Sequence, residues 1–176
     1  MSHFNHCKFD VRYELFKTFA MPLYGSILWN YTSTGIKRFY TAWRKCVRRV
    51  LGVPYTTHCN LLHYICADDD VVTQLSRRFV KFIQTVKKGG NYTSNLCIKL
   101  AVAGSRSNIA NTMSYISSQF HISRYDILNK PVTHIKTNCV THLFDVANVI
   151  RDILYDRVSL LNHNECADML YILCTD

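Results

Sequence analysis

The chain has 176 residues, a length that fits one medium domain or two small ones. Hydrophobic residues make up 48% of it, which is enough for a folded core and excludes a generally disordered chain. The formal net charge is +9, which indicates a polyanionic partner, and no apolar run reaches the length of a membrane span.

The amino-terminal residues, MSHFNHCKFD, lack the apolar core of a secretory signal peptide. The chain contains eight cysteines, and without such a signal these are expected to be reduced thiols. We therefore expect a cytoplasmic or nuclear protein, or one found in both compartments, that has no membrane partner.

The positive charge is unevenly distributed along the sequence. Residues 1–52 contain nine Lys or Arg and two acidic residues, a net charge of +7, whereas the remainder of the chain has a net charge of +2. This distribution places the electrostatic interest in the first third of the chain.

Apolar residues recur at spacings of three and four, which is typical of helices, and convincing alternation for strands is scarce. A first helix is predicted over residues 11–20 and is interrupted at Pro22. Ser33 or Thr34 is suited to cap the next helix, and Gly52 marks its end.

This second helix, over residues 33–52, is strongly amphipathic. One side is apolar and contains Ile36, Phe39, Tyr40, Trp43, Val47, Val50 and Leu51. The other side has six cations: Lys37, Arg38, Arg44, Lys45, Arg48 and Arg49. Three interpretations fit such a helix: a nucleic-acid surface, a membrane surface, or a solvated face without a partner.

Further helices are predicted along the rest of the chain. Thr57 is expected to cap a short helix through Ile65, and the acidic run Asp68–Asp70 precedes the start of the next, where carboxylates are favourable. Gly89 ends that helix, and residues 89–95, GGNYTSN, are the best linker candidate.

The remaining predicted helices span residues 96–103, 109–120, 140–161 and 165–173. The fold class is therefore all-α, an irregular helical bundle. It is expected to divide into a basic unit over residues 1–88, the linker at 89–95, and a smaller, more neutral helical unit over 96–176.

Two motifs in the first half of the chain are similar to a known family. The segments LFKTFAMPLYGSILWNYT and FYTAWRKCVRRVLGVPYTTHCNLL resemble the region just after the catalytic palm in reverse transcriptases of LINE-type, non-LTR retrotransposons. The matching residues are Tyr24, Gly25, Ser26, Leu28, Trp29, Trp43, Arg44, Lys45, Arg48, Arg49, Leu51, Pro54, Tyr55, Thr57 and His58. The resemblance is specific over residues 12–90, and the ending NECADMLYILCTD is similar to the last residues of such polyproteins.

The resemblance implies a piece of such a polyprotein that runs from the thumb to the stop codon, so the unit over residues 1–88 would be thumb-like. The palm carboxylates and the endonuclease would lie upstream, and the chain would therefore be no enzyme and need no cofactor. In this family the thumb and the following segments grip the template–primer duplex and retrotransposon RNA. That role transfers to Lys37, Arg38, Arg44, Lys45, Arg48 and Arg49, with the rest of the polyprotein as another partner.

Physical chemistry supports a nucleic-acid role for the same helix. Lys and Arg side chains that contact phosphates release counterions, which supplies much of the sequence-independent affinity for RNA or an RNA–DNA duplex. Tyr40 and Tyr55 border the basic face and are candidates for base stacking. The rival hypothesis is a structural or protein–protein interaction module with no nucleic-acid partner.

Other constellations favour ordinary structural roles. The stretch ICADDDVV imitates the Ala-Asp-Asp palm motif of polymerases, but it follows the thumb-like block and has helical flanks, so Asp68–Asp70 are interpreted as an acidic turn. His58, Cys59, His63 and Cys66 form a second cluster, which lacks a recognisable third catalytic group or oxyanion hole.

A zinc site is the alternative interpretation of Cys139, His142, His163 and Cys166, which form a C-x-x-H…H-x-x-C pattern. The residues between the two pairs are predicted to form one continuous helix, which at about 1.5 Å per residue would hold the pairs roughly 30 Å apart. We therefore expect no metal, and interpret these residues as small buried thiols and surface or capping histidines.

Overall fold

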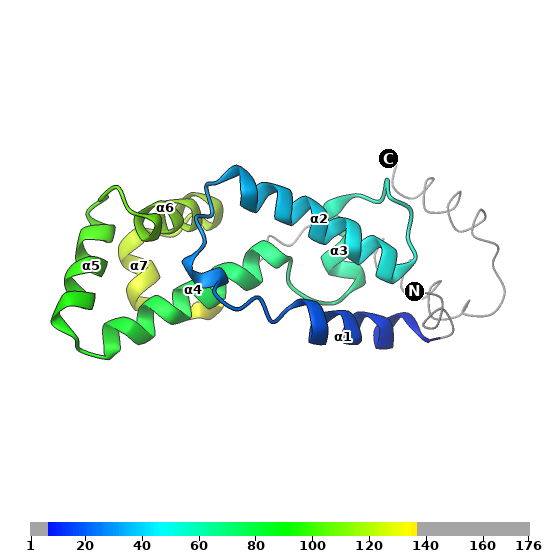
Figure 1. The fold of residues 1–176 in the computed structure, drawn as a ribbon, viewed down its shortest axis with the longest axis horizontal. Helices are drawn as coiled ribbons and strands as arrows, with labels where there is room; N and C mark the ends of the chain where they lie inside the picture. Colours follow the sequence, from blue (N-terminus) through cyan, green and yellow to red (C-terminus); the bar gives the residue numbers. More distant parts are fainter. Residues whose placement is uncertain (1–6, 137–176) are drawn as a thin grey trace. The chain divides into compact units, whose positions relative to one another are not determined.

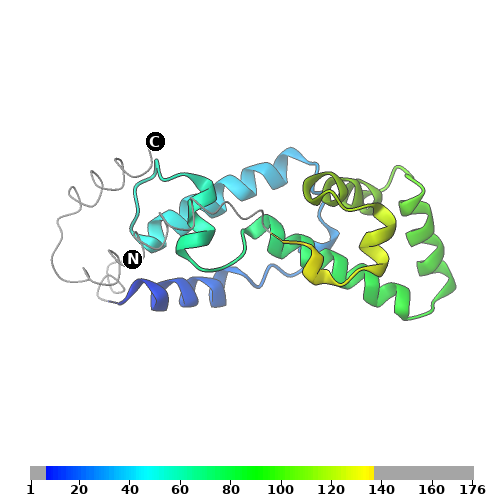
Figure 2. The same cartoon turned by 180° about the vertical axis from the view of Figure 1, so that it is seen from behind.

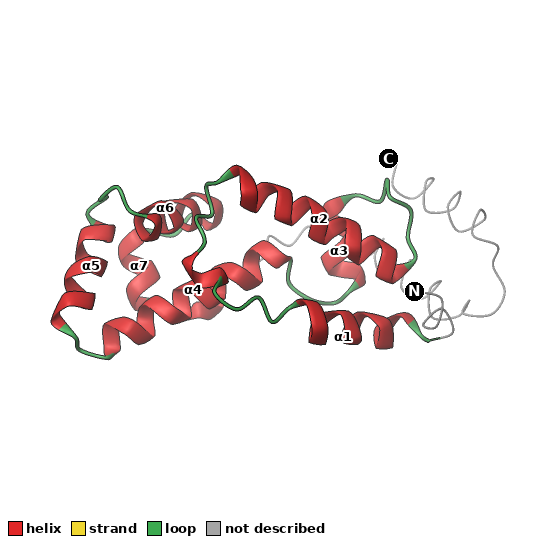
Figure 3. Ribbon diagram, viewed as in Figure 1, coloured by secondary structure: helices red, strands yellow, loops and turns green. Residues whose placement is uncertain are grey.

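A computed structural model describes residues 7–136, and every regular element in that range is a helix (Figures 1 and 3), which confirms the all-α class. The described residues divide into two compact units. Unit 1 consists of residues 7–23 and 41–70, and unit 2 consists of residues 24–40 and 71–136. Within residues 7–136 the chain therefore passes between the units three times.

Unit 1 is built from three helices. These are α1 (Phe9–Ala20), the carboxyl-terminal part of α2 (Thr34–Leu51) and α3 (Cys59–Ile65). Both views show α3 between α1 and this part of α2 (Figures 1 and 2). The buried core of unit 1 contains Tyr13, Val47, Leu51, Val53, Leu61, Leu62, Tyr64 and Ile65.

The apolar side of α2 packs against α1 within unit 1. Trp43 packs against Phe16 of α1 with 4.7 Å between the ring centroids, so this tryptophan serves the core as the apolar spacing predicts. Gly52 then ends α2 with a φ of +73°, a conformation that costs little only for glycine.

The caps of two helices can be compared with the predictions. The Ser33 hydroxyl accepts a hydrogen bond from the backbone N–H of Ile36 at 3.3 Å, so Ser33 caps α2 as predicted. The prediction that Thr57 caps α3 is wrong. His58 is the cap, and its Nδ1 accepts from the N–H of Asn60 at 3.3 Å. Thr57 is buried instead, and its backbone carbonyl accepts hydrogen bonds from Arg48.

Unit 2 is organised around the long helix α4 (Val71–Lys88). Its other helices are α5 (Tyr92–Val102), α6 (Asn108–Phe120) and α7 (Arg124–Asn129), with single 3-10 turns η2 (Ser26–Leu28) and η3 (Val132–His134). Helix α4 contacts η2, α5, α7 and η3, while α6 packs against α5 and α7 (Figure 1). Leu75, Phe79 and Ile83, which follow one another at a spacing of four residues, are among the buried residues of α4.

Tyr31 joins the segment 24–40 to the helices of unit 2. Its side chain is 0% exposed, and its hydroxyl donates a hydrogen bond to the carbonyl of Leu75 at 3.1 Å. The Thr112 hydroxyl of α6 donates to the carbonyl of Trp29 at 3.0 Å and accepts from the N–H of Tyr31 at 3.4 Å. Trp29 also packs against Phe39, with 5.3 Å between ring centroids.

The predicted division at residues 89–95 needs correction. Helix α5 already begins at Tyr92, and both α4 and α5 belong to unit 2. Gly90 has a φ of +71°, and the Asn91 side chain accepts from the N–H of Ser94 at 3.2 Å. Gly-Gly-Asn is therefore a tight connection between two packed helices. Its composition is also typical of a linker, so composition alone does not distinguish the two.

The predicted helices over residues 140–161 and 165–173, and the zinc alternative at Cys139, His142, His163 and Cys166, lie outside the described residues. Within residues 7–136, none of the helices combines the length and the hydrophobicity that crossing a membrane requires.

Candidate nucleic-acid interface

Helix α2 separates its cations into two rows. Ile36, Tyr40, Val47 and Leu51 are buried and define its inner side. At 100° per residue, Arg38, Lys45 and Arg49 lie within about 40° of one another on the opposite side. All three side chains are exposed. We call these three residues the α2 basic face; Arg38 is in the part of α2 that belongs to unit 2, and the other two are in unit 1.

The second row has Lys37, Arg44 and Arg48, which the same periodicity places beside the buried side. Arg44 Nη2 lies 3.4 Å from Asp70 Oδ2, and both side chains are partly exposed. Lys37 is exposed near the start of the helix. A cation next to the apolar stripe is close to the elements that cover that stripe, and Arg44 and Arg48 contact those elements.

Arg48 shows this structural role most clearly. Its Nε and Nη2 both donate to the backbone carbonyl of Thr57, at 3.0 and 2.8 Å, and Nη2 also lies 3.1 Å from Cys59 Sγ. The planar guanidinium therefore fixes the loop between α2 and α3. Sequence reasoning grouped Arg48 with the exposed cations, because a helical pattern alone does not show which carbonyl a side chain will meet.

Replacement of Arg48 by methionine should destabilise unit 1 by about 1.5 to 3 kcal/mol, since a charged donor pair to a part-buried carbonyl is lost. Urea denaturation measured by the fluorescence of Trp43, in a Trp29→Phe background, would report unit 1 separately. Arg49→Met is the matched control, because Arg49 is exposed, and it should change stability by less than about 0.5 kcal/mol. Equal effects of the two substitutions would contradict the structural role of Arg48.

Tyr55 follows the end of α2 and is 87% exposed. Its ring is therefore available to a ligand, whereas the ring of Tyr40, the other stacking candidate, is buried because it faces the inner side of α2. Among residues 7–136, no ion pair neutralises Arg38, Lys45 or Arg49. The candidate interface on α2 thus consists of its basic face, with Lys37 and Tyr55 beside it along the chain.

The acidic turn at Asp68–Asp70 is used within unit 1. Asp68 Oδ2 lies 3.3 Å from Lys17 Nζ and 3.5 Å from the Tyr13 hydroxyl, while Asp70 pairs with Arg44. Burial, together with Cys66 and Asp68, raises the pKa of Tyr13, so this phenol remains protonated and donates to the carboxylate. These carboxylates therefore join α1 and α2 to the turn, in keeping with the interpretation as a structural acidic segment.

His63 gives unit 1 a pH dependence. Burial lowers the pKa of His63, and the carboxylates of Asp70 and Asp69 oppose this shift only in part. The unfolded chain therefore binds the proton more readily than the folded chain does. The stability that unit 1 gains by keeping His63 neutral is fully present above the ordinary histidine pKa of 6.5 and is lost as the pH falls below it.

We expect unit 1 to lose stability as the pH falls from about 7.5 to 5.5, a range in which carboxyl groups with ordinary pKa values stay ionised. The His63→Phe variant keeps a ring at this position, next to Tyr64 at 3.9 Å between centroids, and should lose that part of the pH dependence. Urea midpoints at each pH, measured for both proteins through Trp43, give the difference. A difference that does not change with pH would contradict the assignment to His63.

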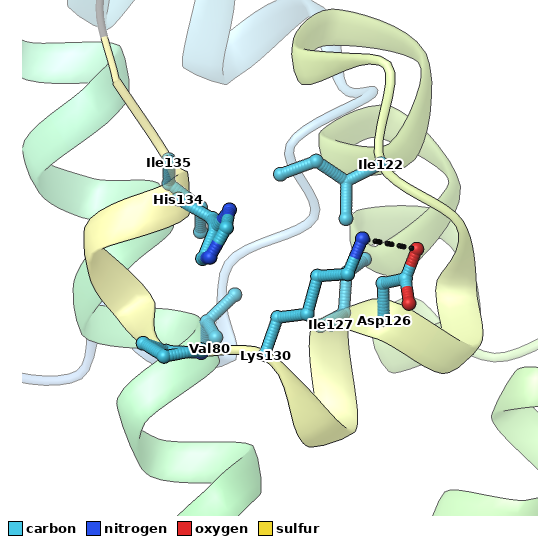
Figure 4. A pocket seen from close by; sticks show the side chains of 8 residues that line it. Val80, Ile122, Asp126, Ile127, Lys130, His134 and Ile135 are labelled. Atoms are coloured by element: carbon cyan, nitrogen blue, oxygen red, sulfur yellow. Dashed lines mark ion pairs between the residues drawn. The ribbon is translucent and has the colours of Figure 1, made fainter.

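The described residues offer little to a metal or a small molecule. Within residues 7–136, no three His, Cys, Asp or Glu side chains are grouped so as to hold a metal ion. A pocket in unit 2 lies between α4, α7 and η3 (Figure 4), where Lys130 pairs with Asp126 at 3.1 Å. Its cavity volume is about 10 Å³, which is room for a single water molecule.

The two units of the fold differ in net charge. Unit 2, over residues 24–40 and 71–136, contains twelve Lys or Arg and one acidic residue, Asp126, which gives a net charge of +11. The described part of unit 1 contains seven Lys or Arg and five acids, a net charge of +2. The sequence led us to expect the main excess of positive charge in the first third of the chain. This expectation is revised, because most of the cationic excess belongs to unit 2.

Comparison with known proteins gives no match to a family model, a curated protein or a solved structure. The resemblance to the post-palm region of LINE-type reverse transcriptases consequently remains an inference from the motif residues.

Proposed function

We propose that this chain is a non-catalytic part of a LINE-type reverse transcriptase, from the region after the palm, that binds RNA or an RNA–DNA duplex through phosphate contacts. The observation that supports the proposal is the α2 basic face, where Arg38, Lys45 and Arg49 are exposed on one side of a single helix. The proposed origin in a reverse transcriptase rests on the motif residues around Trp43.

The arrangement fits a sugar-phosphate chain better than a single anion. Along a helix that rises 1.5 Å per residue, Arg38 and Lys45 are about 10 Å apart, and Lys45 and Arg49 are about 6 Å apart. Cations spread along a line contact successive phosphates and release their counterions, with little readout of base sequence.

A salt titration tests the proposal. Fluorescence anisotropy of a labelled RNA hairpin and of an RNA–DNA duplex, between 50 and 300 mM salt, gives the dependence of the binding constant on salt. Three phosphate contacts from α2 alone correspond to a slope of log K against log salt of roughly −2.7, and contacts from unit 2 would make it steeper. Absence of binding at 50 mM salt would favour the rival, a protein–protein interaction module.

The proposal assigns no catalysis to this chain, because Asp68 and Asp70 pair with different cations within unit 1. Primer extension with magnesium is the direct check. Nucleotide incorporation by this chain alone would overturn the interpretation of the acidic turn.

A further inference from the structure

Unit 2 exposes aromatic rings among its cations. Tyr92 is 81% exposed and Tyr125 is 69% exposed. Lys87 and Lys88, at the end of α4, are exposed as well. Exposed rings placed beside lysines suit a partner that has both flat apolar groups and negative charge.

Hydrogen bonds hold Lys87 and Tyr125 near each other. Lys87 Nζ donates to Asn129 Oδ1 at 2.8 Å, and Asn129 Nδ2 donates to the backbone carbonyl of Tyr125 at 2.8 Å. Tyr125 and Asn129 are four residues apart, so they lie on the same face of α7. The end of α4 and this face of α7 therefore form one surface.

The second tyrosine, Tyr92, follows the same lysines closely along the chain. Tyr92 is four residues after Lys88, so the two Cα atoms are at most about 14 Å apart. The turn between them is fixed by Gly90, with its φ of +71°, and by the cap at Asn91. We call Lys87, Lys88, Tyr92 and Tyr125 the lysine–tyrosine patch.

We propose that the lysine–tyrosine patch binds single-stranded nucleic acid, by stacking bases on Tyr92 and Tyr125 and contacting phosphates with Lys87 and Lys88. The inference rests on the proposed function, and it adds a strand class and a surface distinct from α2. Paired bases in a duplex keep their faces covered, whereas a single strand offers each base to an aromatic ring. The net charge of +11 on unit 2 attracts the strand.

An acidic peptide is a weaker candidate for this surface. It would satisfy the lysines, but it has no regular supply of flat rings to cover two exposed tyrosines. An anionic membrane could take up both the rings and the lysines, and vesicles are therefore included in the test as a competing outcome.

The experiment compares a 12-nucleotide uridine RNA with a fully paired RNA hairpin, both by fluorescence anisotropy at 100 mM salt. In the full chain, Tyr92→Ala with Tyr125→Ala should weaken binding of the uridine RNA by about tenfold or more, since each stacked base contributes measurably. Binding of the hairpin should change by less than threefold. Tyr92→Phe with Tyr125→Phe keeps both rings and should restore the affinity, whereas leucine at both positions should not.

Charge is tested separately. Lys87→Gln with Lys88→Gln should make the salt slope for the uridine RNA less negative by roughly 1.5. The matched control is Arg106→Gln with Lys136→Gln, which removes two exposed cations of unit 2 outside the patch and should have a smaller effect. Melting followed by Trp29 fluorescence verifies that each variant of unit 2 is folded.

Three results would overturn the inference, and they are distinguishable. If wild-type protein binds neither RNA, the proposed function fails and the patch fails with it. If wild type binds both RNAs and the alanine variant is unchanged, the patch alone is wrong. If vesicles containing phosphatidylserine bind the patch and leucine restores binding, the surface is a membrane site.

Discussion

Replacing Tyr31 by alanine is expected to destabilise unit 2 by about 3 to 5 kcal/mol, the range for large aromatic side chains removed from a core. Tyr31 is 0% exposed and packs against Phe79 with 6.0 Å between ring centroids. The substitution also removes the hydroxyl that donates to the carbonyl of Leu75 at 3.1 Å. Because domains are typically stable by about 5 to 15 kcal/mol, unit 2 would become marginal.

Urea denaturation followed by the fluorescence of Trp29, in a Trp43→Phe background, measures this loss in unit 2. Tyr31→Phe is the control that keeps the ring and removes the hydroxyl, and it should cost about 1 kcal/mol. If Tyr31→Ala costs no more than Tyr31→Phe, then the ring does not anchor the segment 24–40 to α4.

The second large effect concerns the α2 basic face. Replacing Arg38, Lys45 and Arg49 together by glutamine should make the salt slope for the RNA hairpin less negative by about 2.7 and weaken binding about tenfold or more at low salt. Because all three side chains are exposed, stability should change by less than about 1 kcal/mol. Anisotropy over 50 to 300 mM salt measures the slope, and urea denaturation verifies the fold.

Two controls separate a specific face from net charge. Arg38→Lys with Arg49→Lys keeps every charge and should leave the slope unchanged. Glutamine at Lys8, Lys99 and Lys136 removes three exposed cations that lie off α2. If this second variant reduces the slope as much as the α2 variant does, binding depends on total charge and the α2 basic face is not the interface.

Part of the candidate interface was predictable from the sequence. The alternation of rings and cations over α2 predicts both an inner side, now occupied by residues such as Val47, and an outer cationic side. The same pattern does not tell Arg49, which is exposed, from Arg48, which donates twice to the Thr57 carbonyl. The difference arises because the loop after α2 folds back beside one row of the helix.

The lysine–tyrosine patch could not be predicted from the sequence. Tyr125 is 38 residues beyond Lys87, and Asn129 links the two when α7 packs on α4. An exposed tyrosine and a buried one have the same signature in a single sequence. The position of each ring depends on which neighbouring helix covers it.

The sequence by itself determined that the described part of this protein is helical, where α2 is capped and ends, and that cations follow one side of it, since these depend on neighbours within four residues. Tertiary structure decided the division into units, because residues 24–40 join 71–136 through Tyr31 and Thr112, contacts that no local pattern encodes. Tertiary structure therefore also decided where the charge lies, because a unit built from separate segments collects cations that a linear count assigns to different parts of the chain.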